Sequence, residues 1–306
     1  MNIDLSIVIV CWNTRDLLKQ CLDSVYANPP QWLFEIWVVD NASSDETASM
    51  VRLSFPEVKL IENKKNVGFA AANNQAVQMC SGSFVLLLNP DTIVKPRALE
   101  YLLAFMKDHP QVGGTGPRLL NADESFQLSC YPFPTLTREF WRLFYLDKIL
   151  PYALYDLSRW DLSTPRDVDS IQGACLLLRR EVLDQVGLFD ADYFLYSEEI
   201  DLCYRIKRAG WRLVWVPEVV VIHFGGQSSK QVATQSFLNL YRGKVLFFRK
   251  HYGRIYAWFY RCVLLLAALA RLAISPFAWL EPSSRRVVHL RLAQNYFQLL
   301  KAIPHL

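Results

Sequence analysis

The sequence lacks the glycine-rich loops with which many α/β proteins bind nucleotide phosphates. Neither a Gly-x-Gly-x-x-Gly nor a Gly-Lys-Ser/Thr loop occurs, and residues 11–15, which follow the first apolar run, contain no glycine. This absence disfavours a dinucleotide-dependent dehydrogenase and a P-loop ATPase. A protein that binds a diphosphate without such a loop is expected to use a metal ion in its place.

Paired cysteines are also missing. The seven cysteines are scattered, odd in number and without any Cys-x-x-Cys spacing. We expect them to pack as small hydrophobic residues, because neither a disulfide framework nor a zinc site fits this pattern.

The chain has no uninterrupted apolar run of about 20 residues, the length that a membrane-spanning helix needs. The run 262–270 stops at Arg271, and Pro276 interrupts the next one. We expect these residues to form an interfacial amphipathic helix or hairpin that lies on a membrane. Packing on the body, or an oligomer interface, is the alternative. A basic segment followed by an apolar run of signal-peptide length is absent near Met1, so we expect the body at the cytoplasmic face.

Acidic residues are scarce toward the end of the chain. From Arg242 onward there are eleven lysines or arginines and one acid, Glu281, which is a net +10. Because the whole chain of 306 residues carries +4, the preceding residues carry −6. The basic side chains alternate with long aliphatic runs, which favours an anionic membrane over nucleic acid as partner.

Strand-like and helix-like segments alternate along the chain. Continuous apolar runs predict buried strands, and apolar residues three or four positions apart predict helices. We expect strands at 5–12, 35–39, 58–61, 84–88, 174–178 and 219–222, and helices at 17–25, after 45, at 69–79, at 136–149 and from 198 to 209. This order predicts an α/β fold with a mostly parallel, Rossmann-like sheet flanked by helices.

Three local patterns add detail. Asn13 is of a residue type that caps helices and precedes the first helical pattern. Residues 113–117, which include three glycines, predict a bend. Residues 121–169, rich in aromatic residues and prolines, predict long loops around the helix at 136–149.

A carboxylate follows the most apolar strand. Residues 84–88 are all apolar, and the chain must turn at Asn89-Pro90-Asp91 because proline cannot continue a central strand. Ligands of open α/β sheets bind at this edge, and the oxygen atoms of Asp91 suit Mg²⁺ or Mn²⁺ held between protein and diphosphate. An Asx turn, in which Asp91 binds its own backbone, is the alternative.

Further polar side chains stand at other strand ends. Asp40 ends the strand at 35–39, and His223 ends the strand at 219–222. An imidazole could complete a metal site that Asp91 begins, although single histidines are more often structural. Glu198, Glu199 and Asp201 open a helix, where acids stabilise the helix dipole; a clustered carboxylate can also act as a general base.

Together these residues resemble the inverting glycosyltransferase family 2, which has the GT-A fold. The resemblance covers roughly residues 5–250 and rests on five stretches: 6–13, 38–47, 66–74, 87–91 and 197–201. Asn89 replaces the first acid of the family's Asp-x-Asp motif, as in the rhamnosyltransferase-like subgroup. The resemblance implies a catalytic domain at 1–240, with a nucleotide-sugar half at 1–118 and an acceptor half at 119–240, followed by membrane-associating helices at 241–306.

The resemblance also implies roles for individual residues. Glu199 or Glu198 is the catalytic base, Asp91 and His223 hold Mg²⁺ or Mn²⁺, and Gly173 and Asp201 lie on the acceptor side. The implied nucleotide-sugar contacts are Cys11, Asn13, Asp40, Asn41, Gly68, Asn73, Asn89 and Asp91.

The implied reaction is a direct displacement. The base deprotonates an acceptor hydroxyl, which attacks the anomeric carbon opposite the leaving nucleoside diphosphate, so the configuration inverts. The donor is expected to be dTDP-rhamnose, with UDP- and GDP-sugars open, and the acceptor a lipid-linked glycan of cell-surface or cell-wall polysaccharide synthesis. A nucleotidyltransferase and a non-catalytic membrane protein that binds nucleotide sugars are the alternatives.

Overall fold

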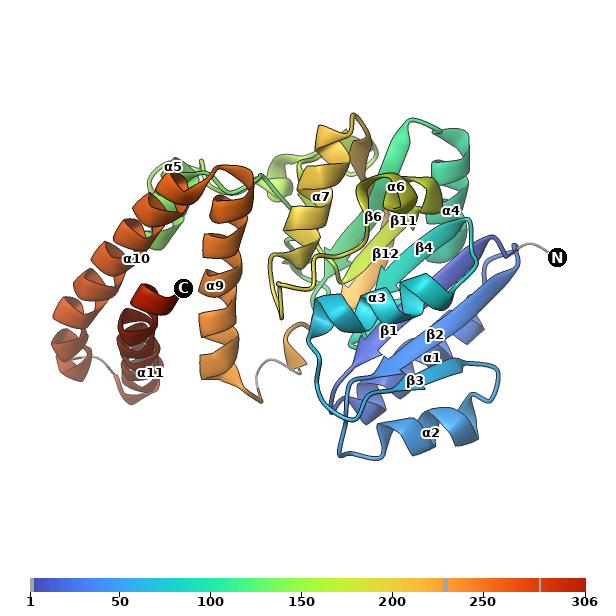
Figure 1. The fold of residues 1–306 in the computed structure, drawn as a ribbon, viewed down its shortest axis with the longest axis horizontal. Helices are drawn as coiled ribbons and strands as arrows, with labels where there is room; N and C mark the ends of the chain where they lie inside the picture. Colours follow the sequence, from blue (N-terminus) through green and yellow to red (C-terminus); the bar gives the residue numbers. More distant parts are fainter. Residues whose placement is uncertain (1–2, 228–230, 281) are drawn as a thin grey trace. The chain divides into compact units, whose positions relative to one another are not determined.

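The computed structural model describes residues 3–227, 231–280 and 282–306, and the chain divides into an α/β unit and a helical unit (Figure 1). The described residues of the α/β unit fall within Met1–Phe133, Asp156–Phe194 and Glu198–Ser228, and those of the helical unit within Pro134–Tyr155, Leu195–Ser197 and Ser229–Leu306. Glu281, the single acid of the basic segment, lies outside the described residues.

The α/β unit contains the strands and helices that the apolar pattern predicts, although the strand expected at 219–222 is longer and begins at Arg212. It also contains two helices, at 98–108 and 180–186, a nine-residue strand at 112–120 and several short strands that were not predicted. Its helices are α1 (Arg15–Ala27), α2 (Thr47–Ser54), α3 (Phe69–Met79), α4 (Ala98–Asp108), α6 (Arg180–Val186), α7 (Glu198–Arg208) and the short η2 (Leu157–Arg159). Its strands are β1 (Leu5–Cys11), β2 (Phe34–Asp40), β3 (Lys59–Glu62), β4 (Phe84–Leu88), β5 (Thr92–Val94), β6 (Val112–Leu120), β7 (Phe126–Gln127), β8 (Cys130–Tyr131), β9 (Arg166–Asp167), β10 (Ser170–Ile171), β11 (Cys175–Arg179) and β12 (Arg212–His223). In Figure 1, α3 and α6 lie in front of the sheet and α1 behind it.

The main sheet has the strand order β3-β2-β1-β4-β11-β6-β12-β5. The first four strands are parallel, as short βαβ connections require, so the predicted α/β class is confirmed. Beyond β4 the sheet is mixed, because β11 runs antiparallel to β4 and β5 antiparallel to β12. β11 is preceded by long irregular segments and not by a βαβ crossover, so it need not run parallel to β4.

The bend predicted at 113–117 is wrong, because these residues are the middle of β6. The glycines there permit close packing. A Cβ at Gly114 would lie 2.8 Å from a methyl carbon of Leu178, and one at Gly116 would lie 2.3 Å from Ile171. Neither glycine has a positive φ. Glycine is therefore needed here because neighbouring side chains leave no room for a Cβ, and not because the chain turns.

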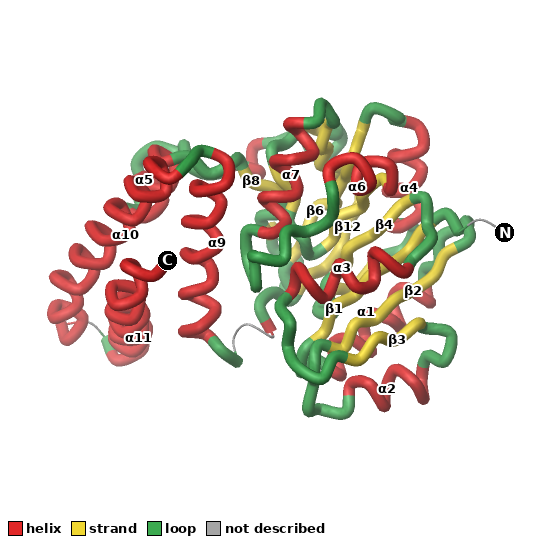
Figure 2. Tube along the Cα trace, in the orientation of Figure 1, coloured by secondary structure: helices red, strands yellow, loops and turns green. Residues whose placement is uncertain are grey.

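The helical unit contains α5 (Leu136–Leu143), η1 (Leu146–Lys148), α9 (Ala233–His251), α10 (Arg254–Ile274), η3 (Ser275–Leu280), α11 (Ser283–Ala302) and η4 (Ile303–His305). Helices α9, α10 and α11 contact one another around their own apolar core (Figure 2). The helix predicted at 136–149 is shorter than expected. It ends at Leu143 because Tyr145 turns the chain with a φ of 55° before η1.

A buried ion cluster joins three helices of this unit. Glu139 on α5 accepts two hydrogen bonds from Lys244 on α9, at 2.7 and 2.9 Å, and one from the hydroxyl of Tyr260 on α10, at 3.0 Å. Arg142 contacts the same carboxylate at 2.8 Å. Burial raises the pKa of Glu139, but the charges of Lys244 and Arg142 outweigh it and bring the pKa down to about 2.

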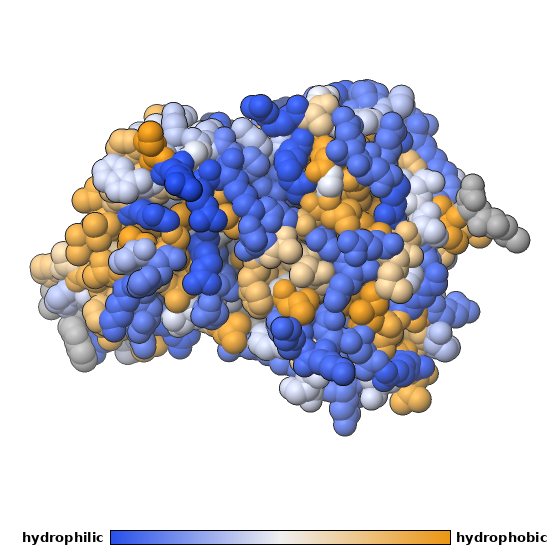
Figure 3. All heavy atoms as spheres, viewed as in Figure 1, coloured by the Kyte–Doolittle hydropathy of each residue, from blue (hydrophilic) through white to orange (hydrophobic). Residues whose placement is uncertain are grey.

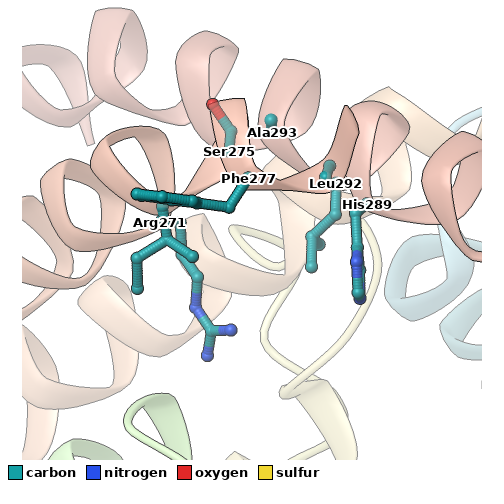
Figure 4. A pocket seen from close by; sticks show the side chains of 8 residues that line it. Arg271, Ser275, Phe277, His289, Leu292 and Ala293 are labelled. Atoms are coloured by element: carbon teal, nitrogen blue, oxygen red, sulfur yellow. The ribbon is translucent and has the colours of Figure 1, made fainter. Parts of the chain in front are cut away.

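A small cavity of about 180 Å³ lies where α10, η3 and α11 meet (Figure 4). Its lining is mostly apolar, with Phe277 and Leu292 among the side chains shown. The Arg271 guanidinium at its border donates to the carbonyl of Leu143 at 2.9 Å and stacks over the ring of Tyr145 at 4.0 Å. Arg271, which interrupts the apolar pattern in the sequence, is therefore bound within the helical unit.

Large apolar side chains remain exposed on the helical unit, and in Figure 3 they gather over α10. Ile255, Trp258 and Leu266 on α10 are each more than half exposed, at 69%, 57% and 56%. Within the described residues, Arg254–Ala278 is the one helical stretch whose length and composition would allow it to cross a membrane. Exposed apolar side chains that cluster in this way are typical of an interaction surface.

We predict that Glu139→Gln destabilises the helical unit. The variant leaves Lys244 buried beside a neutral amide, so we expect the free energy of unfolding at pH 7 to fall by about 3–5 kcal/mol. The wild-type carboxylate stabilises the fold fully above its unfolded pKa of about 4.5, and this contribution, roughly 3 kcal/mol, is lost as the pH falls toward 2. Urea unfolding followed by circular dichroism at pH 7, 4 and 2.5 measures both effects.

The control is Glu124→Gln, which removes an exposed carboxylate 3.4 Å from Lys95. We expect this change to cost less than about 0.5 kcal/mol. If Glu139→Gln kept the acid sensitivity of the wild type between pH 5 and 2, the role of this cluster would be refuted.

Candidate active site

The carboxyl ends of three neighbouring parallel strands meet at one edge of the sheet. β2 ends with Asp40, β1 with Cys11, and β4 is followed directly by Asn89 and Asp91. β1 lies between β2 and β4 in the sheet, so the ends of β2 and β4 are separated by about 10 Å. This spacing suits a ligand that extends across the edge, such as a nucleoside diphosphate.

Asp91, Asn89 and His223 converge at this edge. The Nε2 atom of His223 lies 3.2 Å from Oδ1 of Asp91 and 3.3 Å from Nδ2 of Asn89. Antiparallel pairing of β12 with β5 sets His223 opposite Thr92, and the amide of Phe224 donates to the carbonyl of Asp91 at 2.9 Å. The backbone therefore holds the imidazole against the carboxylate.

Gln127 fixes the orientation and the tautomer of His223. Its Nε2 atom donates to the side-chain oxygen of Asn121 at 2.7 Å and to the carbonyl of His223 at 3.0 Å. The amide oxygen of Gln127 consequently faces Nδ1 of His223, at 2.7 Å, and accepts its proton. A neutral His223 then has its lone pair at Nε2, where the side-chain nitrogen of Asn89 can donate to it at 3.3 Å. No motif in the sequence points to this residue, because Gln127 lies in a two-residue strand outside every motif.

A divalent cation fits this arrangement. Two atoms with lone pairs, Asp91 Oδ1 and His223 Nε2, face each other at 3.2 Å, which is unfavourable unless a proton or a cation lies beside both. A hydrogen bond that fixes the distal nitrogen is usual for metal-binding histidines. Among the described residues, no group of three or more His, Cys, Asp or Glu side chains could hold a metal. The remaining ligands would therefore come from substrate or water.

Two loops at the edge are bound to each other through Asn13. Its backbone amide donates to the hydroxyl of Ser43 at 2.9 Å, and its side-chain oxygen accepts from the amide of Ser44 at 2.8 Å. Asp40 is 5% exposed and accepts from the amide of Ser43 at 3.1 Å. The prediction that Asn13 caps α1 is wrong: Thr14 holds that position, and Asn13 adopts a φ of 51° in the preceding turn.

Asn41 organises the loop that precedes α3. Its side-chain oxygen accepts from the amide of Val67 at 3.0 Å, and its side-chain nitrogen donates to Asn66 at 2.9 Å. Gly68 has a φ of 87°, and a Cβ there would lie 2.6 Å from the carbonyl oxygen of Phe194, so this position requires glycine.

Two of the predicted nucleotide-sugar contacts, Asn73 and Cys11, are each only 1% exposed. Asn73, on α3, donates to the carbonyl of Phe69 on its own helix at 2.9 Å. The thiol of Cys11 donates to the carbonyl of Val39. Their roles toward a nucleotide sugar stay predictions.

The first turn of α7 carries Glu198, Glu199 and Asp201, and we call it the acidic turn. Its three carboxylates have different surroundings. Glu198 is 4% exposed, and its Oε2 has no hydrogen-bond partner among the described residues. Burial and the neighbouring charge of Glu199 raise the pKa of Glu198 well above its ordinary value. The side chain of Glu199 instead passes Gly173, where an added Cβ would lie 3.6 Å from the Cβ of Glu199. Asp201 pairs with Arg205 at 2.9 Å.

We predict that neutral His223 carries its proton on Nδ1 and that Gln127→Leu removes this preference. The variant keeps the size of the side chain but deletes the acceptor that holds the proton. Two-dimensional ¹H–¹⁵N NMR of the imidazole nitrogens measures the tautomer. The signals of His109, whose Nδ1 faces the carbonyl of Phe105 at 2.8 Å, should not change and serve as the internal control. A wild-type His223 protonated on Nε2 would contradict the assignment.

Comparisons with known proteins bear on the family and the fold. Over 214 residues the chain is 30% identical to the N-acetylglucosaminyl-diphospho-decaprenol L-rhamnosyltransferase of Mycobacterium tuberculosis, covering 63% of this chain and 67% of that protein. It is 27% identical to the rhamnosyltransferase WbbL of Escherichia coli K12, covering 76% and 87%.

A solved structure shares the fold. The mannosyltransferase PcManGT of Pyrobaculum calidifontis, in complex with GDP-Man and Mn²⁺, aligns with a TM-score of 0.57 at 20% identity, covering 99% of this chain and 85% of that one. The GT-A fold expected from the sequence is thereby confirmed.

The model of the family described as "Glycosyltransferase like family 2" matches residues 3–241, which is most of the chain. This match and the relatives show that the protein is a glycosyltransferase and belongs to that family.

Proposed function

We propose that this glycosyltransferase moves a sugar from a nucleoside-diphosphate sugar to a hydroxyl of a lipid-linked glycan, with inversion at the anomeric carbon. The observation that carries the proposal is the convergence of Asp91, Asn89 and His223 Nε2 at the strand edge. The mycobacterial relative, whose name includes a diphospho-decaprenol carrier, supports an acceptor of this class for cell-surface polysaccharide synthesis.

The donor half, residues 1–118, would hold the nucleotide across the ends of β2, β1 and β4. Asp40 and the turn at Asn13 lie where a base or ribose would bind, and Asp91 lies where the diphosphate would bind. Two relatives are named rhamnosyltransferases, which favours dTDP-rhamnose. The structural neighbour that binds GDP-Man keeps GDP- and UDP-sugars as the competing donors.

Asp91 and His223 would hold the divalent cation, Mg²⁺ or Mn²⁺. When bound, the cation neutralises the charge that develops on the leaving diphosphate. Asn89, which carries no charge, can contribute a hydrogen bond, while Gln127 keeps the lone pair of His223 Nε2 directed toward Asp91.

Glu199 is the base that we assign to the acceptor hydroxyl. Its side chain reaches past Gly173 on the acceptor side, whereas Glu198 is buried and favours its neutral form. A neutral Glu198 lets Glu199 keep its negative charge, because two adjacent carboxylates ionise together only at a cost. Asp201, paired with Arg205 and contacted by the hydroxyl of Tyr193 at 3.4 Å, positions the first turn of α7.

The helical unit would attach the enzyme to the cytoplasmic face of the membrane. Its exposed apolar side chains on α10 and its excess of basic residues suit an anionic lipid surface. Attachment by helices that lie on the bilayer would bring the enzyme to a lipid-linked acceptor without a spanning segment.

We predict that Glu199→Gln lowers the rate of sugar transfer by about 10²–10⁴, the usual contribution of a positioned base. Glu198→Gln, which resembles the neutral acid in shape, should retain the wild-type rate within about threefold. Product formation with dTDP-rhamnose, UDP-sugars and GDP-sugars measures both variants. If Glu198→Gln lost as much activity as Glu199→Gln, the base would be misassigned. If the wild type formed no product with any of these nucleotide sugars, the proposed function would be refuted.

We predict that Asp91→Asn removes the divalent cation together with transfer. The amide keeps the shape of the side chain but loses the charge that a hard cation needs, so Mn²⁺ affinity should fall at least about 100-fold. Calorimetry of Mn²⁺ with the nucleoside diphosphate present measures the affinity. Asp23→Asn, at an exposed carboxylate 2.7 Å from Lys19, is the control and should bind Mn²⁺ as the wild type does. Unchanged affinity in Asp91→Asn would contradict the metal assignment.

A further inference from the structure

The short ladder of β8 and β10 lies against α7, the helix that begins with Glu198 and Glu199 (β8 is labelled beside α7 in Figure 2). Tyr131 pairs with Ser170, and the amide of Gln172 donates to the carbonyl of Ser129 at 2.9 Å, which continues the antiparallel register. Residues opposite each other in such a ladder share a face. Ser129, Tyr131, Ser170 and Gln172 therefore form one polar face.

One end of this face holds buried polar atoms that lack partners. Ser129 is 1% exposed, and neither its hydroxyl nor the side-chain oxygen of Gln172 has a hydrogen-bond partner among the described residues. Ser170, on the same face, is satisfied, because its hydroxyl donates to the carbonyl of Tyr131 at 2.9 Å. Native proteins rarely bury unpaired polar atoms, and each one destabilises the fold unless a ligand completes it.

The unsatisfied end lies beside the base that we assign. Gln172 immediately precedes Gly173, the residue over which the side chain of Glu199 passes. The negative charge of Glu199 also reaches Tyr131: burial, followed by that charge, raises the pKa of the Tyr131 phenol to about 12. Tyr131 therefore stays a proton donor at neutral pH, and its present hydrogen bond, to the carbonyl of Leu128, is long at 3.4 Å.

We propose that Ser129, Gln172 and Tyr131 form a hydroxyl-binding subsite that positions the acceptor sugar next to Glu199. The ligand class is a polyol. One sugar hydroxyl would donate to the side-chain oxygen of Gln172 and pair with the hydroxyl of Ser129, while the Tyr131 phenol donates to a neighbouring sugar oxygen. These are positioning residues that act through the acceptor. The inference rests on the proposed function, because it assumes a sugar acceptor at the acidic turn.

Such a subsite would select acceptors by their hydroxyls. A site built to bind a substrate hydroxyl rejects the analogue without it, because the site's own polar atoms are then left unpaired. We therefore expect the wild type to discriminate at least about tenfold against the deoxy acceptor that lacks the bound hydroxyl. Variants without the matching polar atom should lose this discrimination.

The test compares Ser129→Ala and Gln172→Met with Ser170→Ala. The first two remove unsatisfied polar atoms, so we expect Tm of the full chain to rise by about 1–4 °C, whereas Ser170→Ala removes a made hydrogen bond and should lower Tm. Calorimetric binding of octyl N-acetylglucosaminide, a soluble acceptor probe, should weaken about tenfold in the first two variants and stay within twofold in the third. KM for the nucleotide sugar, which reports the donor half, should not change in any of them.

Two results would overturn the subsite. In the first, Ser129→Ala and Gln172→Met both bind the probe as tightly as the wild type does. In the second, both variants lower Tm by as much as Ser170→Ala does. The probe measurement needs no turnover, so it separates this inference from the proposed function. A wild-type protein that binds the probe but neither hydrolyses nor transfers from any nucleotide sugar would refute the function and leave the subsite supported.

Discussion

The strand edge depends on the contact between Asp91 Oδ1 and His223 Nε2, which the fold holds 3.2 Å apart. Each is fixed by a different part of the fold: the turn after β4 places the carboxylate, and β12, paired with β5, places the imidazole. Gln127 holds Nδ1 of the ring at 2.7 Å, and Asn89 lies 3.3 Å from Nε2. In the proposed function this arrangement would hold a divalent cation beside the leaving diphosphate.

On the proposed acceptor side, several polar atoms are buried without hydrogen-bond partners among the described residues. Oε2 of Glu198 is buried without a hydrogen-bond partner among the described residues, and burial raises the pKa of this carboxyl. The neighbouring ladder of β8 and β10 contains further unsatisfied polar atoms, at Ser129 and Gln172. The helical unit is stabilised separately, by the buried carboxylate of Glu139 and its cationic partners.

Much of the edge could be predicted because strand ends are local in sequence. An apolar run that stops at Asn-Pro-Asp predicts both the strand β4 and the place of Asp91, and the run before His223 does the same for β12. What could not be predicted depends on packing between distant segments. The glycines at 113–116 suggest a bend in the sequence, but in the structure Leu178 and Ile171 pack against them within a strand. The role of Gln127 depends on its contact with His223, which is distant in sequence. Glu198 and Glu199 differ in burial, which adjacent residues of one helix do not reveal in sequence.

The most direct measurement of the central claim is pulsed electron paramagnetic resonance of Mn²⁺ bound with a nucleoside diphosphate. Coordination through His223 predicts nitrogen modulation from one imidazole, which changes when the histidines are labelled with ¹⁵N and disappears in His223→Ala. A spectrum with phosphorus coupling from the diphosphate but no imidazole nitrogen would contradict the account, because the lone pair that Gln127 directs toward Asp91 would then not face the cation.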